Sequence, residues 1–371
     1  MSELQVGKND ITQTRLVSAG DDPASFDLAE GEILLTVERF SFTANNVTYG
    51  AIGEQIGYWK FFPPTHQNGD EGDDWGIVPV WGFGEVVASK SDIIEIGERV
   101  YGYLPMAQFV RLRPGRISDD RFVDVTPHRT ELPAVYNNYD RLGKDSANAA
   151  NDNLRALLNP LYGTSFCLCD ALDEEAYRGA EQVVILSASS KTAIGLAFGL
   201  SQLEGERPSI IGLTSPANTD FVARVEAYDV VLGYDQIDKL ENRPSLMVDM
   251  SGNRAVIGAV HALLGDNMLW CHNVGLTHWD DEAYKSDPAA DQIIRDRSAM
   301  FFAPGHIERR AKEWGGLSFN QKVSGFLQGG IQHANTWIQV HETSGLDNFA
   351  EIYARVVAGD MRPEEGIIIL P

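Results

Sequence analysis

From residue 181 onward, short apolar runs alternate with segments of helix length, and this rhythm constrains the fold more than any other feature of the chain. The apolar runs occupy residues 183–186, 209–214, 229–234, 245–250, 268–274 and 299–303. Strands that alternate with helices build right-handed βαβ units, whose parallel strands are covered on both faces. The second half of the chain is therefore predicted to form a Rossmann-type, doubly wound parallel sheet.

A polar turn follows the first apolar run, at the point where the next helix is expected to begin. Its hydroxyls and its single cation belong to Ser187, Ser189, Ser190, Lys191 and Thr192. Free N–H groups and the positive end of the helix dipole favour a bound phosphate at such a position. The glycines usual there are missing, so these side chains would have to replace close backbone approach. A serine-rich helix cap without a ligand is the alternative.

The first part of the chain is organised differently. Up to about residue 110, β-like runs at residues 32–40, 82–89 and 97–103 are separated by glycines and turns. Closely spaced short strands of this kind predict a small, barrel-like β domain. Residues 111–160 show weak periodicity and are predicted to be an inserted loop region that leads into a helix over residues 154–171.

Composition limits the partners and the location of the protein. The chain has 53 Asp and Glu against 30 Lys and Arg, a formal net charge of −23. Such a field repels nucleic acids and anionic lipids, so neither is expected as a partner. No apolar run reaches the roughly 18 residues of a membrane helix, and the polar start lacks a signal peptide's apolar stretch. Cys167, Cys169 and Cys271 form no paired framework, which predicts reduced thiols in a cytoplasmic protein.

With these elements in order, the chain resembles the zinc-independent, quinone-oxidoreductase-like branch of the medium-chain dehydrogenase/reductase superfamily. Residues 97–102, GERVYG, are similar to the family signature G-D-R-V-x-G. Residues 31–50 resemble the family's early strand and the loop that follows it beside the active site. Residues 180–202 resemble its first βαβ turn, and residues 301–315 and 364–371 its closing segments.

The resemblance implies an α/β protein with two domains. Residues 1–160 and 321–371 would form a GroES-like β-barrel catalytic domain, and residues 161–320 a Rossmann dinucleotide-binding domain. Zinc-dependent relatives carry a Gly-His-Glu motif, but the corresponding residues 81–85 read WGFGE, without a histidine. Three cysteines cannot build the relatives' four-cysteine zinc lobe either, so no metal is expected.

The end of the second Rossmann strand indicates which nicotinamide cofactor the chain would use. An acidic residue there favours NAD, whereas hydroxyls and cations favour the phosphate of NADP. No acidic residue follows this run before Asp220, and Ser215 and Asn218 can donate to a 2′-phosphate beside Lys191. We therefore favour NADP(H) over NAD(H). An ordinary helix cap is the alternative for these residues.

The resemblance also implies the remaining contacts to the cofactor. Tyr234, at the end of the third strand, corresponds to a residue near the adenine ribose. Thr164 corresponds to a residue under the nicotinamide ring. Asn273, Gly275 and Phe302 correspond to backbone contacts with the carboxamide.

A hydride acceptor needs a hydrogen-bond donor where negative charge develops on its oxygen. By resemblance this donor lies in the segment after the early strand, where Asn46 and Tyr49 are the best candidates, followed by Tyr58. Four aromatic residues between positions 58 and 62 suit a planar, apolar or aromatic small molecule. Packing in the β-domain core is the alternative for these rings. Tyr136 is a candidate lid residue, although turn chemistry explains it equally well.

The sequence thus predicts a zinc-independent, NADPH-dependent oxidoreductase that transfers a hydride to a carbonyl, an enone or a quinone-type small molecule. The missing glycines favour an alternative, a non-catalytic NADP(H)-binding or redox-responsive protein of the same fold. The resemblance further implies a homodimer.

Overall fold

The chain folds into two compact units in the computed structural model. The structure describes residues 2–18, 22–65, 74–203, 205–274 and 292–371. Unit 1 comprises Met1–Pro160 and Gln339–Pro371, and unit 2 comprises Leu161–Ile338. Within the described residues, no helix combines the length and the apolar character needed to cross a membrane.

Unit 2 is built on a parallel sheet. Over the described residues its strand order is β13-β12-β11-β14-β15-β16, and every strand is parallel to its neighbours. The first strand along the chain lies in the middle, as in doubly wound nucleotide-binding sheets, so the predicted Rossmann-type sheet is confirmed. The strands are β11 Gln182–Leu186, β12 Ser209–Thr214, β13 Val230–Gly233, β14 Ser245–Asp249, β15 Met268–Asn273 and β16 Ser298–Met300.

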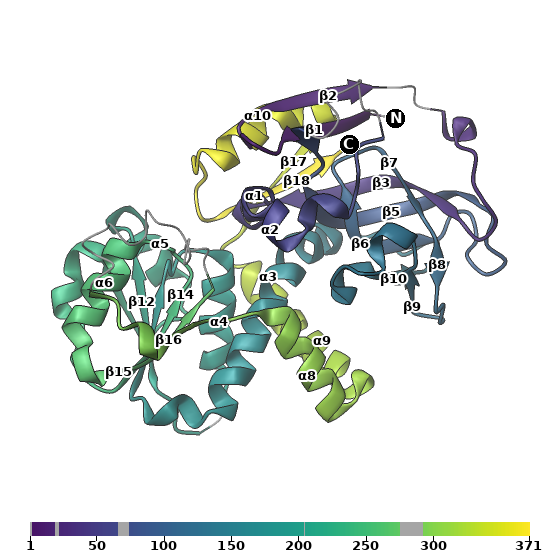
Figure 1. The fold of residues 1–371 in the computed structure, drawn as a ribbon. Coiled ribbons are helices and arrows are strands. Elements are labelled where there is room, and N and C mark those ends of the chain that lie inside the picture. Colours follow the sequence, from purple (N-terminus) through teal and green to yellow (C-terminus); the bar gives the residue numbers. More distant parts are fainter. Residues whose placement is uncertain (1, 19–21, 66–73, 204, 275–291) are drawn as a thin grey trace. The chain divides into compact units, whose positions relative to one another are not determined.

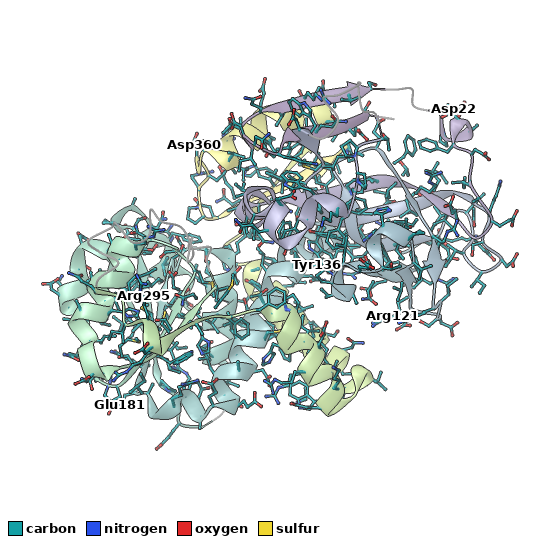
Figure 2. All side chains as sticks on the ribbon, viewed as in Figure 1. Asp22, Arg121, Tyr136, Glu181, Arg295 and Asp360 are labelled. Atoms are coloured by element: carbon teal, nitrogen blue, oxygen red, sulfur yellow. The ribbon has the colours of Figure 1, made fainter. Side chains whose placement is uncertain are left out.

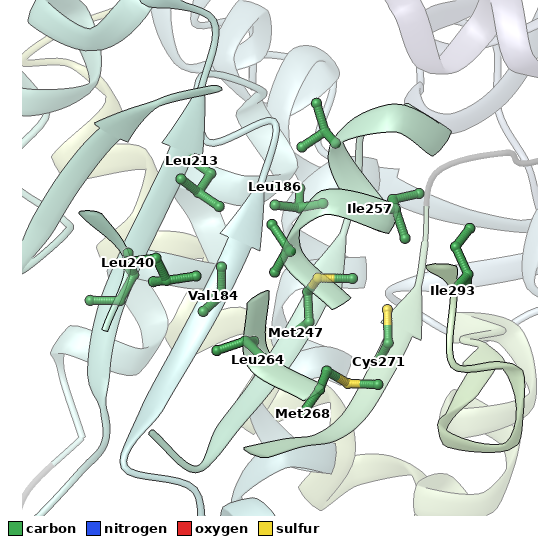
Figure 3. Packing of buried hydrophobic residues seen from close by; sticks show 13 residues of the cluster. Val184, Leu186, Leu213, Leu240, Met247, Ile257, Leu264, Met268, Cys271 and Ile293 are labelled. Atoms are coloured by element: carbon green, nitrogen blue, oxygen red, sulfur yellow. The ribbon is translucent and has the colours of Figure 1, made fainter. Parts of the chain in front are cut away.

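Helices cover both faces of this sheet (Figure 1). They include α4 Lys191–Ser201, α5 Thr219–Arg224 and α6 Arg254–Leu264. The helices α8 Ala303–Trp314 and α9 Gly316–Ala334 pack against each other farther from the sheet. Figure 3 shows Val184 and Leu186 of β11 in one apolar cluster with Ile257 and Leu264 of α6. Each of these side chains is almost completely buried, which contributes about 1.5–3 kcal/mol apiece. This core fixes the carboxyl end of β11, where the polar turn begins.

On the other side of unit 2, α9 packs against α3 and α4. The helix α3 spans Ala149–Glu174 and contains the predicted helix over residues 154–171. Its Tyr162 leaves no room for a Cβ at Gly195 of α4 or at Gly330 of α9, because either atom would lie 2.6 Å from the ring. Since α9 packs here, the chain returns to unit 1 at Gln339, later than the expected residue 321.

Unit 1 is rich in β-structure, as predicted. One sheet has the order β2-β1-β4, and the larger has the order β17-β18-β3-β5-β6-β10-β9-β8, with β7 also paired to β3. The C-terminal strand β18 is antiparallel to β3. The strands are β1 Ser2–Gly7, β2 Thr14–Ser18, β3 Ile33–Phe42, β4 Trp75–Gly76, β5 Pro79–Ser89, β6 Arg99–Pro105, β7 Phe109–Leu112, β8 Pro114–Gly115, β9 Arg121–Asp124, β10 Asn138–Leu142, β17 Gln339–Ser344 and β18 Glu365–Leu370.

Short helices complete unit 1. The helices are α1 Ala44–Ala51, α2 Gly53–Ile56 and α10 Leu346–Val357. Three single-turn 3-10 helices matter for the site: η2 Tyr58–Lys60, η4 Pro127–Arg129 and η5 Ala134–Asn137. On α10, the ring of Phe349 packs edge-on against Phe40 and Phe42 of β3.

Two expectations for unit 1 are wrong. Residues 111–160 are not an inserted loop region, because β9 and β10 extend the large sheet beside β6. These strands have only four and five residues, too few to show a clear alternating pattern. The segment after β3 is also not a loop, because Thr43 and Asn46 form a capping box that starts α1.

Candidate functional site

The turn between β11 and α4 in unit 2 has an unusual backbone. Ser187 directly follows the strand and has a φ of +56°, a left-handed conformation that is uncommon outside glycine. Ser190 then caps the helix, since its hydroxyl accepts a hydrogen bond from the Ala193 N–H at 3.3 Å. The chain therefore turns sharply into α4 and leaves the helix N-terminus at the carboxyl end of the sheet.

Side chains from two neighbouring strand ends complete this turn. The hydroxyl of Tyr234, after β13, accepts a hydrogen bond from the Ser187 N–H at 3.0 Å. The hydroxyl of Ser189 accepts two hydrogen bonds, from Thr214 and from the Asn218 amide, each at 3.2 Å. The structure thus brings Ser187, Ser189, Asn218 and Tyr234 together, although their polar groups are largely engaged with one another.

The remaining candidates for the phosphate end of the cofactor lie at the start of α4 and directly after β12. Lys191 and Thr192 form the first turn of α4 and are half-buried. The Thr192 carbonyl accepts a hydrogen bond from Ser165 of α3 at 2.8 Å. Ser215 follows β12 directly, and its side chain makes no capping hydrogen bond. The first acidic side chain after β12 is Asp220, which already belongs to α5.

The candidates for the nicotinamide end are more scattered. Asn273 is buried at the end of β15, where its amide donates to the Ala299 carbonyl at 3.3 Å. Phe302 precedes α8 with 51% of its surface exposed. Thr164 is half-buried on α3 and shares no hydrogen bond with the turn among the described residues. Gly275 lies outside the described residues.

In unit 1, Asn46 performs a structural task on α1. Its side-chain oxygen accepts hydrogen bonds from the Thr43 N–H at 2.9 Å and from the Thr43 hydroxyl at 3.2 Å. Its amide donates to the Pro79 carbonyl of β5 at 3.0 Å, and only 3% of the residue is exposed. Asn46 therefore starts α1 and ties it to β5, which leaves it little capacity to bind a substrate.

Tyr49 and Tyr58 come together with Tyr136. The rings of Tyr49 and Tyr58 lie 4.4 Å apart, and the hydroxyls of Tyr58 and Tyr136 are hydrogen-bonded at 2.9 Å. The amide of Asn45 donates to the Tyr49 hydroxyl at 2.8 Å. Burial raises the pKa of all three phenols, so they stay protonated at neutral pH, and one O–H of the Tyr58–Tyr136 pair is used in the hydrogen bond between them.

Trp81 of β5 and Tyr103 of β6 belong to the same cluster, and the sequence did not single them out as site residues. Their rings lie 5.1 Å apart, and Tyr103 is 4.7 Å from the ring of Tyr136. The hydroxyl of Tyr103 is buried without a hydrogen-bond partner among the described residues, whereas the Trp81 side chain interacts with that of Tyr49. The sequence predicts only a β-strand over residues 97–103, which contains Tyr103. We call Tyr49, Tyr58, Trp81, Tyr103 and Tyr136 the aromatic cluster.

A buried arginine, Arg129, fixes the backbone of Tyr136 in the aromatic cluster. Arg129 is 1% exposed and pairs with Asp124 of β9 at 2.8 Å. It also donates to the Tyr136 carbonyl and to the Tyr139 hydroxyl, each at 2.9 Å. Figure 2 shows Tyr136 among the densely packed side chains of unit 1. No pattern in the sequence distinguishes Arg129 from the other arginines of this stretch.

Metal-binding groups are not gathered in the part of the chain that the structure describes. No three His, Cys, Asp or Glu side chains there lie close enough to share an ion. Cys167 and Cys169 are buried on α3, and Cys271 is buried on β15. Burial raises the pKa of each thiol, so all three are protonated at neutral pH and are poor ligands.

Solved structures similar to this chain share its whole fold. CurA from Vibrio vulnificus in complex with NADPH has a TM-score of 0.63 at 15% identity, over 100% of this chain and 99% of that chain. The quinone oxidoreductase from Coxiella burnetii has a TM-score of 0.55 at 13% identity, over 100% and 99% of the two chains. The CurF ER cyclopropanase from the curacin A biosynthetic pathway has a TM-score of 0.58 at 12% identity, over 100% and 98%. No curated protein matches the sequence.

These likenesses confirm the expected fold, a GroES-like domain combined with a Rossmann domain, as in the medium-chain dehydrogenase/reductase superfamily. A family described as "Protein of unknown function (DUF2855)" matches residues 40–362, most of the chain. The chain therefore belongs to the DUF2855 family and has the fold of the quinone-oxidoreductase-like proteins.

Proposed function

We propose that the chain is a zinc-independent, NADPH-dependent reductase that transfers a hydride to a carbonyl, an enone or a quinone-type small molecule. The observation that carries this proposal is the polar turn of unit 2. Ser187, Ser189 and Ser190 surround the N-terminus of α4 at the carboxyl end of β11, the position where doubly wound sheets bind dinucleotides. NADPH is bound in the CurA structure, which has the same fold.

The residues of the turn fit a dinucleotide with a 2′-phosphate. The α4 N-terminus and Ser190 would hold the pyrophosphate. Ser215 and Asn218, beside Lys191, would hold the 2′-phosphate, because hydroxyls, amides and cations donate hydrogen bonds to phosphate oxygens. No carboxylate follows β12 to repel that phosphate before Asp220. For the nicotinamide end we retain Asn273, Gly275, Phe302 and Thr164 as candidates.

NADPH supplies the hydride, and the protein supplies hydrogen bonds to the acceptor. We assign the acceptor side to the aromatic cluster of unit 1, including the predicted Tyr49 and Tyr58. Protonated phenols donate to an oxygen on which negative charge develops, and stacked rings hold a flat molecule. Asn46 acts as a positioning residue, since it fixes α1 and therefore Tyr49.

A non-catalytic NADP(H)-binding or redox-responsive protein is the second candidate. The observation that favours it is that the Ser187 N–H and the Ser189 hydroxyl already have partners within the protein. A phosphate would have to replace these hydrogen bonds, which lowers the gain from binding.

Consumption of NADPH by the whole chain tests the proposed function. We expect turnover with some members of a panel of quinones, enones and aryl ketones, and a preference for NADPH over NADH. Ser215→Asp should reduce this preference by about tenfold or more, because a carboxylate repels the 2′-phosphate. Thr130→Asp in unit 1 adds the same charge elsewhere and should leave the preference unchanged. NADPH binding without consumption across the panel would favour the second candidate.

Two further features concern the oligomeric state and the location of the protein. Exposed Met300 and Phe302 flank the end of the edge strand β16, which supports the expected homodimer. The three buried free thiols support a reducing, cytoplasmic location.

A further inference from the structure

One tyrosine of unit 2 closes the polar turn from two strands away. Tyr234 follows β13 directly, yet its hydroxyl accepts a hydrogen bond at 3.0 Å from the N–H of Ser187, which follows β11. The strand β12 lies between β13 and β11, and neighbouring strands are about 4.8 Å apart. The phenol side chain therefore crosses the carboxyl end of β12 to reach the turn.

The Tyr234 hydroxyl lies at the point where the strand order of the sheet reverses. Along the chain, β12 and β13 are added on one side of β11, and β14 is added on the other side. Doubly wound sheets bind dinucleotides outside the carboxyl ends of the strands at this reversal. Burial raises the pKa of the Tyr234 phenol, and the carboxylate of Asp249, at the end of β14, raises it further. The neutral phenol thus occupies the place where a dinucleotide would cross the sheet.

The bond to Tyr234 uses a donor that a phosphate would need. A backbone N–H carries a single proton, so a phosphate oxygen and the phenol compete for the Ser187 N–H. The hydroxyl of Ser189 differs, because it accepts hydrogen bonds from Thr214 and Asn218 and still has a proton of its own to donate. The Ser187 N–H is therefore the donor of this turn that Tyr234 withholds from a ligand.

A second tyrosine at the same turn makes a contact of the opposite kind. Tyr228 donates a hydrogen bond to the Ala188 carbonyl at 2.8 Å. Its ring also leaves no room for a Cβ at Gly212, which would lie 2.8 Å from it. Tyr228 therefore supports the turn without occupying any of its N–H groups. Tyr234 is half-buried, and rotation of its side chain frees the Ser187 N–H without a change in the backbone.

We infer that Tyr234 is an autoinhibitory residue, whose hydroxyl stands in for a phosphate oxygen at the Ser187 N–H and has to leave before a dinucleotide occupies the turn. The identity of this ligand, NADPH, rests on the proposed function. The inference reverses the role that the family resemblance implies for Tyr234. A residue that holds the adenine ribose strengthens cofactor binding, whereas an autoinhibitory residue weakens it.

Binding of NADPH to the Tyr234→Phe variant tests the inference. The substitution keeps the ring and removes only the hydroxyl, so the Ser187 N–H is open before the cofactor binds. Titration followed by nicotinamide fluorescence should give a dissociation constant about threefold to tenfold lower than that of the wild-type chain, because one hydrogen bond no longer has to be exchanged. Without NADPH, the variant should unfold at a lower temperature than the wild-type chain, since the bond between Ser187 and Tyr234 is lost.

Tyr228→Phe is the matched control. It removes a phenol hydroxyl from the same turn but frees a carbonyl instead of an N–H. This variant should not bind NADPH more tightly than the wild-type chain does. A gain in affinity equal to that of Tyr234→Phe would overturn the inference, because a loosened turn would then explain both results.

Equal or weaker NADPH binding by Tyr234→Phe would also overturn the inference, and weaker binding would support the contact to the ribose instead. The proposed function fails separately. Binding by Tyr234→Phe but not by the wild-type chain would contradict the reductase and support autoinhibition. Consumption of NADPH by the wild-type chain, with no gain in affinity in the variant, would support the reductase and contradict autoinhibition. Absence of binding in both chains would contradict both.

Discussion

Asn46 shows how a polar residue that looks catalytic in a sequence can be fully used by the fold. Its side chain joins Thr43 to α1 and α1 to the Pro79 carbonyl. We expect Asn46→Ala to lower the free energy of unfolding by about 2–3 kcal/mol, because it removes a helix cap and leaves a buried carbonyl unpaired. Urea unfolding followed by circular dichroism measures this. Asn45→Ala, which removes only the bond to Tyr49, should cost less than about 1 kcal/mol. Equal losses in the two variants would contradict this role.

Ser187 carries backbone strain at the centre of the polar turn between β11 and α4. A non-glycine residue at its φ of +56° is strained by about 1 kcal/mol or more. Ser187→Gly should therefore stabilise the chain by about 0.5–1 kcal/mol, the relief being offset in part by the entropy of glycine in the unfolded state. Thermal unfolding measures the change. Ser187→Ala keeps the strain and should bring no gain, so a similar gain with alanine would show that the hydroxyl, and not φ, is responsible.

At the scale of elements, Arg129 connects β9, η4, η5 and β10. Both partners of its ion pair with Asp124 are 1% exposed. Arg129→Met should destabilise the chain by about 3–5 kcal/mol, because it leaves the Asp124 carboxylate buried and unpaired. The comparison variant is Arg121→Met, whose ion pair with Asp140 is long, at 4.0 Å, and partly exposed. Arg121→Met should lower the free energy of unfolding by less than about 1 kcal/mol. Urea unfolding of both variants measures the difference. A small loss in both variants would show that Arg129 does not organise this region.

The regular elements were predictable because their patterns are long or repeated. The run over residues 209–214 became β12 with the same bounds, and the bounds of the other parallel strands differ from the predicted ones by at most three residues. The strands β9 and β10 were missed, since four or five residues carry little periodicity. The start of α1 was missed because its signal is a capping box between Thr43 and Asn46, which the family resemblance placed in a loop.

The candidate sites were predictable only in part. The polar turn was found because Ser187–Thr192 are contiguous in the sequence and follow a buried strand. The aromatic cluster was found only through Tyr49, Tyr58 and Tyr136, since Trp81 and Tyr103 meet them through strand pairing between β5 and β6. Arg129 was missed because its partners come from three different elements, a relation that no local pattern reports.

At the scale of the whole molecule, acid should destabilise unit 2 through two buried histidines. Burial lowers the pKa of His261 and that of His272 to about 4. An unfolded histidine titrates near 6.5, so between these values the unfolded state binds more protons than the folded state. The free energy of unfolding is therefore highest above pH 6.5 and falls, as pH drops toward 4, by up to about 1.4 kcal/mol per pH unit for each histidine.

Urea unfolding across this pH window measures the effect. His272→Phe removes one of the two groups, and its pH dependence should be shallower than that of the wild-type chain by up to about 1.4 kcal/mol per pH unit. An unchanged slope would mean that His272 does not titrate as its burial implies.

The central claim is that the turn between β11 and α4 binds NADPH. Titration of the chain with NADPH, followed by nicotinamide fluorescence, tests it most directly. We expect saturable binding that is tighter than for NADH and that is displaced by adenosine 2′,5′-bisphosphate, because we propose that Ser215 and Asn218 hold the 2′-phosphate. Absence of binding at millimolar NADPH would contradict the claim.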